Sequence, residues 1–307
     1  MRPLVLALAF AALASPALAQ VCAAWGPPTL LAEVAADQLN EASGLEASTA
    51  FPGRLYHHND SGDGLRFFVT DAKGGDLRSV TVKGAKPDDV EDMALGPCDD
   101  GTCLYLADVG DNGANRSEVA FTLVREKADF ADQEAPLRVV RARYPDGPQN
   151  VEAVAVHPSG DLFVVTKPAD AQMRTPGAAR VYRLSAGQLR ETEGVQVFRR
   201  IGELDLPRLL PDLPFFGWIP TGLDISADGE RAVLLTYMAA VELGFDLAAG
   251  VPEALKAGEN VSIFTAPPLA QQEAIAWLPD DAGFLYDSEV RGEGKTFPLY
   301  EVRCQRR

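Results

Sequence analysis

One pattern occurs five times along this 307-residue chain and limits the folds that it can adopt. Each copy begins with a polar residue and then a small one, and continues as an apolar strand, a turn and a second apolar strand. Alternation of apolar and polar residues with period two is typical of a half-buried β-strand, and pairs such as Asp100-Gly101 are typical of tight turns. The five copies begin at Ser43, Glu91, Glu152, Thr221 and Glu273.

Two more strand-like runs follow most of these hairpins, so the repeating unit contains four strands and spans roughly 50 residues. Units of this kind form the blades of a β-propeller. We therefore predict an all-β protein, a β-propeller with five blades of four antiparallel strands. Six blades are the alternative. The sixth would lie between Glu152 and Thr221, where the extra length is instead a proline-rich linker, PRLLPDLPFFGWIP.

A β-sandwich of many short strands is the competing architecture. It gives no reason for a small residue at the second position of every copy except the one that has Asp92. A propeller does, because its innermost strands crowd around a common axis and leave little room for side chains. The small residues at this position are Gly44, Ala153, Gly222 and Ala274.

The two ends of the chain are expected to close the ring. After its hairpin the fifth copy has only one strand-like run, FPLYEVRC, and the N-terminal segment TLLAEVAADQL can supply the missing strand. This arrangement brings Cys22 near Cys304, while Cys98 and Cys103 flank one of the turns. Four cysteines allow three pairings, and we favour disulfides between Cys22 and Cys304 and between Cys98 and Cys103.

Residues 1–19 have the features of a secretory signal. Arg2 precedes an apolar run from Leu4 to Ala14, and Ala17-Leu18-Ala19 is a small-x-small cleavage site. Disulfides are typical of oxidising compartments outside the cytosol. We therefore predict a periplasmic or secreted protein whose residues 20–307 form a single β-propeller domain.

The charge of the chain bears on its partners. Its formal net charge of −16 makes nucleic acids and anionic membranes poor partners and permits cations. No segment is long and apolar enough for a membrane span. We expect a monomer that binds a small-molecule or protein ligand at the mouth of the propeller channel.

Acidic residues should gather at this mouth if the five copies superpose. Oxygen ligands that converge from several strands suit Ca²⁺, which takes six to eight oxygens. The predicted metal ligands are Glu91, Glu152, Glu273, Asn59, Asp108 and Glu289. The residues expected to contact a bound ligand are Asp60, Asp92, Asp111, Asn112 and Lys167. Alternatively, the carboxylates accept backbone hydrogen bonds at strand ends, and Lys167 replaces a cation or contacts an anionic substrate.

Other chemistries find little support in the sequence. His57 and His58 are adjacent in a strand and should point to opposite faces, so they do not form a zinc-binding pair. The sequence lacks a Gly-x-Ser-x-Gly motif, and Ser61 lies in an acidic loop without an evident base. His157 precedes a proline at a turn and is expected to be structural.

The strings HNDSGDG, VEDMALG, LADVGDN, VEAVAV and QEAIAW resemble exported bacterial propellers of the phytase-like and esterase-like phytase group. The chain is more loosely similar to the gluconolactonase and paraoxonase propellers, which bind Ca²⁺ in the central channel. The resemblance implies an acidic, calcium-bound channel and hydrolysis of esters or phosphoesters. It matches Glu91, Glu152 and Glu273 to the acidic starts of innermost strands, whereas Ser43 and Thr221 depart from that pattern. Those families have six blades, in contrast to the five predicted here.

Two functions therefore compete. The first is an exported β-propeller that binds a ligand or partner at a calcium-binding channel mouth. The alternative is a calcium-dependent hydrolase of phosphoesters, esters or lactones, in which the metal polarises an oxygen and a carboxylate activates water. A coordination site beside a free carboxylate would favour the hydrolase, and a mouth closed by ion pairs would favour binding.

Overall fold

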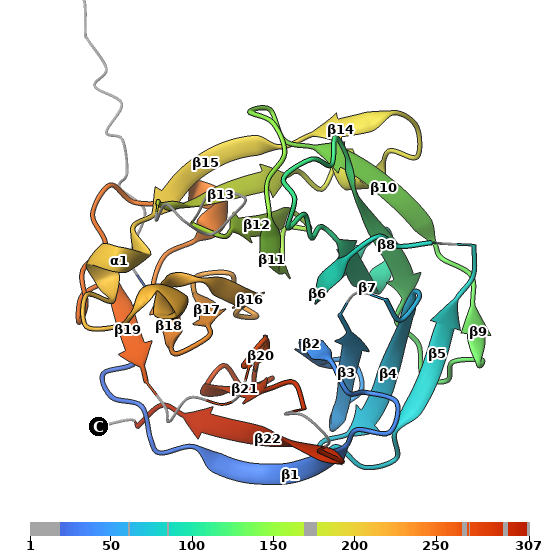
Figure 1. Cartoon of the computed structure of the whole chain (residues 1–307), viewed down its shortest axis with the longest axis horizontal. Coiled ribbons are helices and arrows are strands. Elements are labelled where there is room, and N and C mark those ends of the chain that lie inside the picture. Colours follow the sequence, from blue (N-terminus) through green and yellow to red (C-terminus); the bar gives the residue numbers. More distant parts are fainter. Residues whose placement is uncertain are drawn as a thin grey trace, which may run out of the picture.

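Five small, mainly antiparallel sheets are arranged in a ring around a central channel (Figure 1). The structure is a computed structural model, and it describes residues 19–60, 62–84, 86–168, 177–265, 269, 271–290 and 294–305. This arrangement confirms the predicted five-bladed β-propeller. Residues 1–18, which contain most of the predicted signal segment, lie outside the described residues.

Each blade runs from an innermost strand at the axis to an outer strand at the rim. The first blade contains β2 (Ala42–Ala47), β3 (Arg54–Asn59), β4 (Arg66–Asp71) and β5 (Arg78–Val82). The second contains β6 (Val90–Cys98), β7 (Gly101–Asp108), β8 (Val119–Arg125) and β10 (Arg138–Arg143). The third contains β11 (Val151–Val156), β12 (Leu162–Thr166), β13 (Ala179–Leu184) and β15 (Arg199–Leu204). The fourth contains β16 (Pro220–Ile225), β17 (Ala232–Thr236), β18 (Ala240–Leu243) and β19 (Val261–Phe264).

The fifth blade combines strands from the two ends of the described chain. It contains β20 (Ala274–Trp277), β21 (Gly283–Asp287), β22 (Thr296–Arg303) and β1 (Thr29–Ala35), and β1 pairs antiparallel with β22. A disulfide between Cys22 and Cys304 joins the segments beside these two strands, with their Cα atoms 5.6 Å apart. The structure thus confirms both the closing strand and the disulfide predicted with it.

Two blades carry a fifth, parallel strand that the repeat pattern does not predict. Strand β9 (Gln133–Glu134) pairs with β5, and β14 (Val195–Val197) pairs with β10. The repeat pattern predicts one strand for VQVFRRIGEL, but the run divides at Phe198 into β14 and β15. The buried ring of Phe198 stacks on Tyr144, with ring centroids 4.7 Å apart. This contact holds β14 against the second blade, and β15 continues into the third.

The hairpin of β6 and β7 extends further than its sequence indicates. The turn residues between Pro97 and Gly101 predict a connection over that whole segment, but the two strands pair as far as Cys98 and Gly101, so the connection is Asp99-Asp100. Asp99 has a φ of 39°, in the left-handed region that such tight connections require. The predicted disulfide between Cys98 and Cys103 is present at this end of the hairpin.

The proline-rich linker between the third and fourth blades forms short helices. It contains α1 (Leu206–Leu209) and the 3₁₀ helix η2 (Phe215–Trp218), and forms no sixth sheet. Two more 3₁₀ turns lie elsewhere, η1 (Gln188–Arg190) and η3 (Leu247–Ala249). No helix in the described residues is long and apolar enough to cross a membrane.

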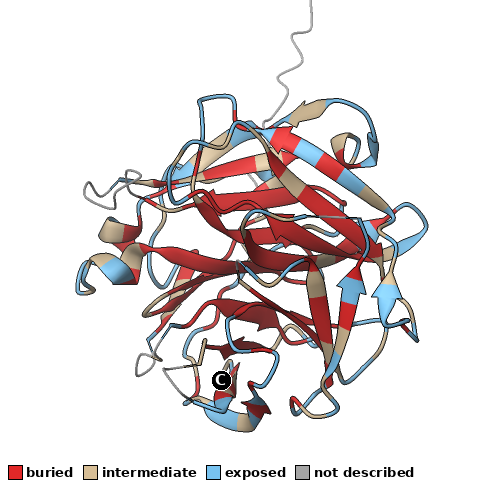
Figure 2. Cartoon of the chain, turned by 45° about the vertical axis from the view of Figure 1, so that its right-hand side comes forward, coloured by how far each residue is buried: buried red, intermediate tan, exposed pale blue. Residues whose placement is uncertain are grey.

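The innermost strands are the most deeply buried part of the molecule (Figure 2). Every residue of β2, β11 and β16 is buried. Small residues are required in these strands because neighbouring side chains and backbone leave no room for a larger one. A Cβ on Gly44 would lie 2.4 Å from the His58 ring, and one on Gly222 would lie 3.1 Å from the backbone oxygen of Glu273.

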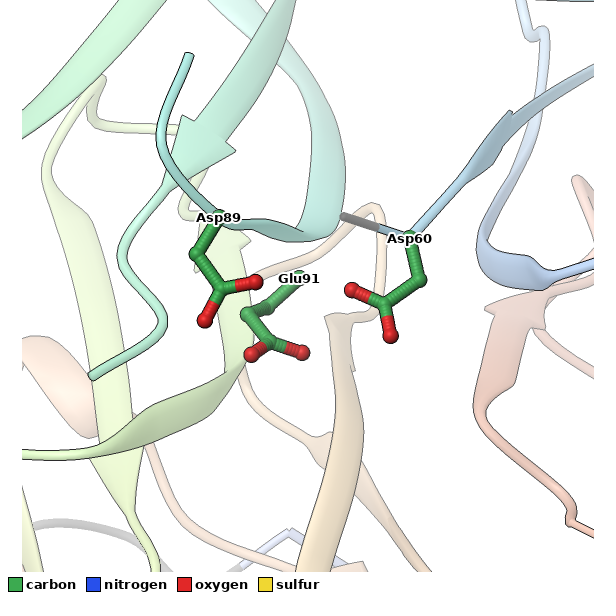
Figure 3. A group of neighbouring side chains, drawn as sticks. All are labelled: Asp60, Asp89 and Glu91. Carbon is green, nitrogen blue, oxygen red and sulfur yellow. The ribbon is translucent and has the colours of Figure 1, made fainter. Parts of the chain in front are cut away.

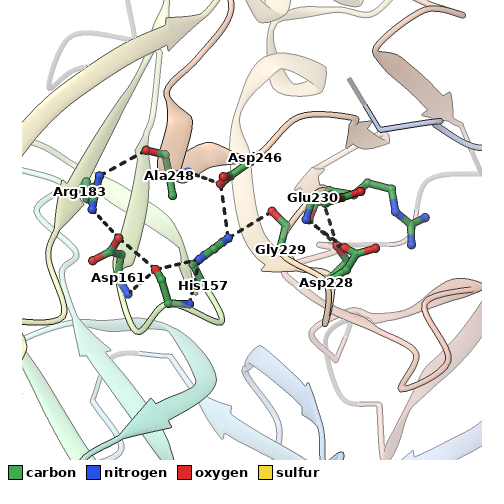
Figure 4. A network of polar contacts seen from close by, with 11 residues as sticks. His157, Asp161, Arg183, Asp228, Gly229, Glu230, Asp246 and Ala248 are labelled. Atoms are coloured by element: carbon green, nitrogen blue, oxygen red, sulfur yellow. Dashed lines mark hydrogen bonds and ion pairs between the residues drawn. The ribbon is translucent and has the colours of Figure 1, made fainter. Parts of the chain in front are cut away.

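Polar contacts also connect the loops of neighbouring blades (Figure 4). His157, which follows β11 of the third blade, lies 3.4 Å from a carboxylate oxygen of Asp246 in the fourth blade. In the same network Asp161 pairs with Arg183, which donates a hydrogen bond to the backbone oxygen of Ala248. The structure therefore gives His157 a contact between two blades, as expected for a structural residue.

Candidate metal centre at the channel mouth

A β-bulge turns the first residue of each repeat out of the regular pleat in four blades. The strand register skips Ser43, Glu91, Glu152 and Thr221. In the fifth blade Glu273 directly precedes β20. A bulge leaves one residue unpaired and changes the direction of its side chain. We call the end of the channel where these five residues lie the channel mouth.

The two hydroxyl residues of this set connect neighbouring blades. The Ser43 hydroxyl donates a 2.6 Å hydrogen bond to the backbone oxygen of Glu91 in the second blade. The Thr221 hydroxyl donates a 2.9 Å hydrogen bond to the backbone oxygen of Gln272, beside the fifth blade. Ser43 and Thr221, which depart from the all-acidic pattern, therefore connect blades, and three glutamates remain at the channel mouth.

Three carboxylates come together at one side of the mouth. One carboxylate oxygen each from Asp60, Asp89 and Glu91 lies within 4.8 Å of the other two, and the three side chains point toward one another (Figure 3). Glu91 is only 4% exposed. A Cβ on Gly110 would lie 2.2 Å from a Glu91 oxygen and 2.3 Å from an Asp89 oxygen. The missing side chain at Gly110 thus leaves the room in which these carboxylates lie.

Polar contacts fix the loop that carries Asp89. The Asp108 carboxylate accepts hydrogen bonds from the backbone N–H groups of Asp88 and Asp89, at 3.2 and 2.9 Å. Arg116 pairs with Asp108 at 2.8 Å and donates to the backbone oxygen of Gly110 at 2.7 Å. Asp108 and Arg116 therefore position the carboxylate group from behind and do not belong to it.

One buried lysine lies among the acidic side chains. Lys167 forms an ion pair with Glu152. Burial lowers the pKa of Lys167, and the nearby carboxylates of Glu91 and Glu273 oppose that shift. Burial, followed by repulsion from Asp60, raises the pKa of Glu91 well above the ordinary glutamate range. Lys167 therefore neutralises part of the mouth, and the group around Glu91 keeps a strong preference for a cation or protons.

The channel mouth also holds a second acidic pair, which comes from the fifth blade. Burial and a hydrogen bond with Glu273 raise the pKa of Glu289 to about 9. Tyr237 also forms a hydrogen bond with Glu273, and burial and this carboxylate both raise the pKa of the tyrosine. Glu289 therefore keeps its proton at neutral pH, while it is hydrogen-bonded to Glu273.

Several predicted site residues have oxygens engaged elsewhere. Oδ1 of Asn59 accepts a hydrogen bond from the backbone N–H of Glu41 at 3.2 Å, and the amide nitrogen donates to the backbone oxygen of Gln38 and to Asp63, each at 2.8 Å. The Asp111 carboxylate accepts hydrogen bonds from the backbone N–H groups of Asn115 and Arg116. The other two engaged residues are Asn112, which accepts from Asn150, and Asp92, which accepts from the backbone of Met93 and Val154.

The structure thus brings together Glu91 from the predicted metal ligands and Asp60 from the predicted ligand contacts. It adds Asp89, which the sequence analysis missed because the repeat was taken to begin at the first strand residue. Asp89 lies two positions before Glu91, and residues two apart share a face of an extended chain. That spacing is the signal that could have identified it.

The five-sheet ring is the architecture of a β-propeller. No family model matches the chain, and no curated protein matches it either. Its fold is similar to that of a luciferin-regenerating enzyme, with a TM-score of 0.46 and 11% identity over 90% of this chain and 95% of that chain. A chain of a nidogen–laminin complex aligns with a TM-score of 0.39 and 13% identity, over 80% of this chain and 72% of that chain. Because both TM-scores are below 0.5, the assignment of the β-propeller fold rests on the arrangement of the five sheets and not on these similarities.

Proposed function

We propose that this protein is an exported β-propeller that binds Ca²⁺ at its channel mouth and, through that site, a ligand or partner. The observation that carries the proposal is the approach of Asp60, Asp89 and Glu91 to within 4.8 Å of one another. Carboxylate oxygens are the ligands that Ca²⁺ prefers, and three of them leave positions for water or for a bound molecule. The resemblance to calcium-binding propellers is in agreement with this proposal.

The burial of Glu91 supports a cation at this position. A carboxylate that is removed from water and placed beside other carboxylates is costly unless a cation or a proton compensates for it. Gly110 keeps the space around Glu91 and Asp89 open, which suits an ion that needs several oxygens at similar distances. Lys167 is engaged with Glu152. Burial and repulsion from Asp60 and Asp89 leave the pKa of Glu91 well above the ordinary range, although the charge of Lys167 lowers it.

A thermal unfolding experiment tests the metal. We expect millimolar Ca²⁺ to raise the melting temperature above its value in chelator, because a ligand that binds only the folded state stabilises it. Mg²⁺ should stabilise less, since it demands a tighter octahedral arrangement. Glu91→Gln keeps the size of the side chain and removes its charge, so the variant should lose most of the response to Ca²⁺.

The matched control is Glu193→Gln, a change of the same kind at an exposed position just before β14. This variant should respond to Ca²⁺ like the unmodified protein. The proposal fails if the melting temperature is the same in Ca²⁺ and in chelator, or if Glu91→Gln and Glu193→Gln respond alike.

Hydrolysis is the second candidate, and the Glu273–Glu289 pair is the observation that favours it. A hydrolase needs a group that can take up or release a proton near the metal, and Glu289, which is hydrogen-bonded to Glu273, keeps its proton at neutral pH. The ion would supply Lewis acidity, and Glu289 would supply the proton. Phosphomonoester, carboxyl ester and lactone substrates should be tested with and without chelator. Turnover that chelator and Glu289→Gln both abolish would establish this function over binding alone.

A further inference from the structure

A cavity lies at the end of the channel opposite to the carboxylates described above. Its volume is about 280 Å³. Each innermost strand contributes a residue from its C-terminal half, whereas the channel mouth is formed where these strands begin. These five residues are Ala47, Leu95, Val156, Ile225 and Trp277. We call this space the far cavity.

Two buried carboxylates line the far cavity. Glu46 in β2 is 4% exposed and Asp224 in β16 is 7% exposed. Both oxygens of Asp224 accept backbone hydrogen bonds, from Ile225 and Trp277, each at 2.6 Å. Glu46 accepts one, from the backbone N–H of Leu95 to its Oε1 at 2.9 Å. In the described part of the chain, Oε2 of Glu46 has no hydrogen-bond partner.

The surroundings of these carboxylates are acidic. Burial first, and then the charge of Asp224, raise the pKa of Glu46 well above the ordinary range. Asp92 adds to the same repulsion from deeper in the channel. The nearby guanidinium of Arg231 is engaged with Glu242 at 3.2 Å and lies over the Trp277 ring. A positive charge that enters the far cavity would therefore relieve repulsion at a side chain with an open hydrogen-bonding position.

The rest of the lining suits an organic ligand better than a bare ion. Leu95, Val156 and Ile225 form apolar walls. Trp277 is buried beside them, and its indole N–H has no hydrogen-bond partner among the described residues. The described residues contain one group of three carboxylates close enough to share an ion, and it lies at the channel mouth. The carboxylates of the far cavity are not part of such a group.

We propose that the far cavity binds a small organic ammonium ion, with its charged nitrogen at Glu46 and Asp224 and its hydrocarbon part against Trp277. A buried carboxylate provides a charge-assisted hydrogen bond to such a nitrogen. The aromatic ring and the aliphatic walls would cover the apolar part, as in most small-molecule sites. This site is independent of the calcium proposal, because it lies at the opposite end of the channel.

Calorimetric titration of the full chain with benzylammonium tests the proposal, with benzyl alcohol as the neutral analogue of the same shape. We expect benzylammonium to bind, both in Ca²⁺ and in chelator, and benzyl alcohol to bind at least ten-fold more weakly. Glu46→Gln should weaken the binding of benzylammonium by at least ten-fold. Glu193→Gln, which changes an exposed glutamate far from the cavity, should leave it unchanged.

A second variant keeps the test decisive if Glu46→Gln does not fold. Ala227 is exposed at the edge of the far cavity, so Ala227→Trp should obstruct entry without changing a buried charge, and should abolish binding. Three results would each overturn the proposal: no binding of benzylammonium, equal binding of benzyl alcohol, or competition by Ca²⁺ that marks a site for inorganic cations. Because the binding of both compounds is also measured in chelator, failure of the calcium proposal would not affect this result.

Discussion

At the scale of single residues, Gly110 controls the geometry of the candidate metal centre. Its φ is not in the left-handed region, so glycine is required here by space and not by backbone conformation. Gly110→Ala should displace the Glu91 and Asp89 carboxylates and remove most of the stabilisation by Ca²⁺ in thermal unfolding. Gly101→Ala is the control, because its added Cβ would contact only the flexible end of Arg125. A normal Ca²⁺ response in Gly110→Ala would contradict the assignment of this group as the site.

The residues of the channel mouth also show how far sequence analysis can go. The repeat identified Glu91, Glu152 and Glu273 as a set, because residues in equivalent positions of a repeat lie at one end of the ring. It could not show that a bulge redirects Glu91 and Glu152, or that Glu152 turns to Lys167. These details depend on contacts between blades, which a pattern within one blade does not contain.

At the scale of strands and blades, backbone groups accept or supply most of the contacts that hold the innermost strands together. Glu46, Asp92 and Asp224 each accept a hydrogen bond from the backbone of the next blade. The sequence predicted the strands well because their period-two pattern is local. It did not predict β9 and β14, since these strands add to blades to which their own segments do not belong.

A buried pair between the first and fifth blades gives a prediction about pH. His57 in β3 lies 3.6 Å from Asp287 in β21, and both side chains are fully buried. Burial raises the pKa of Asp287 to about 6, and His57 opposes this shift. An unfolded aspartate has a pKa of about 4, so the folded state binds this proton first as the pH falls. The stabilisation is full below about pH 4 and is lost as the pH rises through about 6.

Asp287→Asn should remove this contribution, which is about 2–3 kcal/mol across that pH interval. The measurement is the free energy of unfolding from denaturant titrations at several pH values, as the difference between variant and unmodified protein. That difference should change between about pH 4 and pH 6 and be flat above about pH 7. A difference that is constant across the whole interval would show that Asp287 does not titrate in it.

At the scale of the whole molecule, the disulfide between Cys22 and Cys304 should contribute more to stability than the hairpin disulfide. The first links residues 282 positions apart and the second links residues 5 positions apart. Because the loss of chain entropy grows with the length of the closed loop, the expected contributions are about 6 kcal/mol and about 2 kcal/mol. Replacing Cys22 and Cys304 by serine should therefore lower the free energy of unfolding more than replacing Cys98 and Cys103. An equal loss for both pairs would contradict this explanation.

The pairing of β1 with β22 has a consequence for how the protein is made. During synthesis β1 emerges before any other strand of the ring. Its hydrogen-bonding partner, β22, emerges only after the strands of the first four blades. For most of translation the nascent chain therefore carries an unpaired strand edge of the kind that promotes aggregation. Contacts between such distant segments also form slowly. The first four blades can assemble in order, and the fifth can form only after synthesis has passed β22.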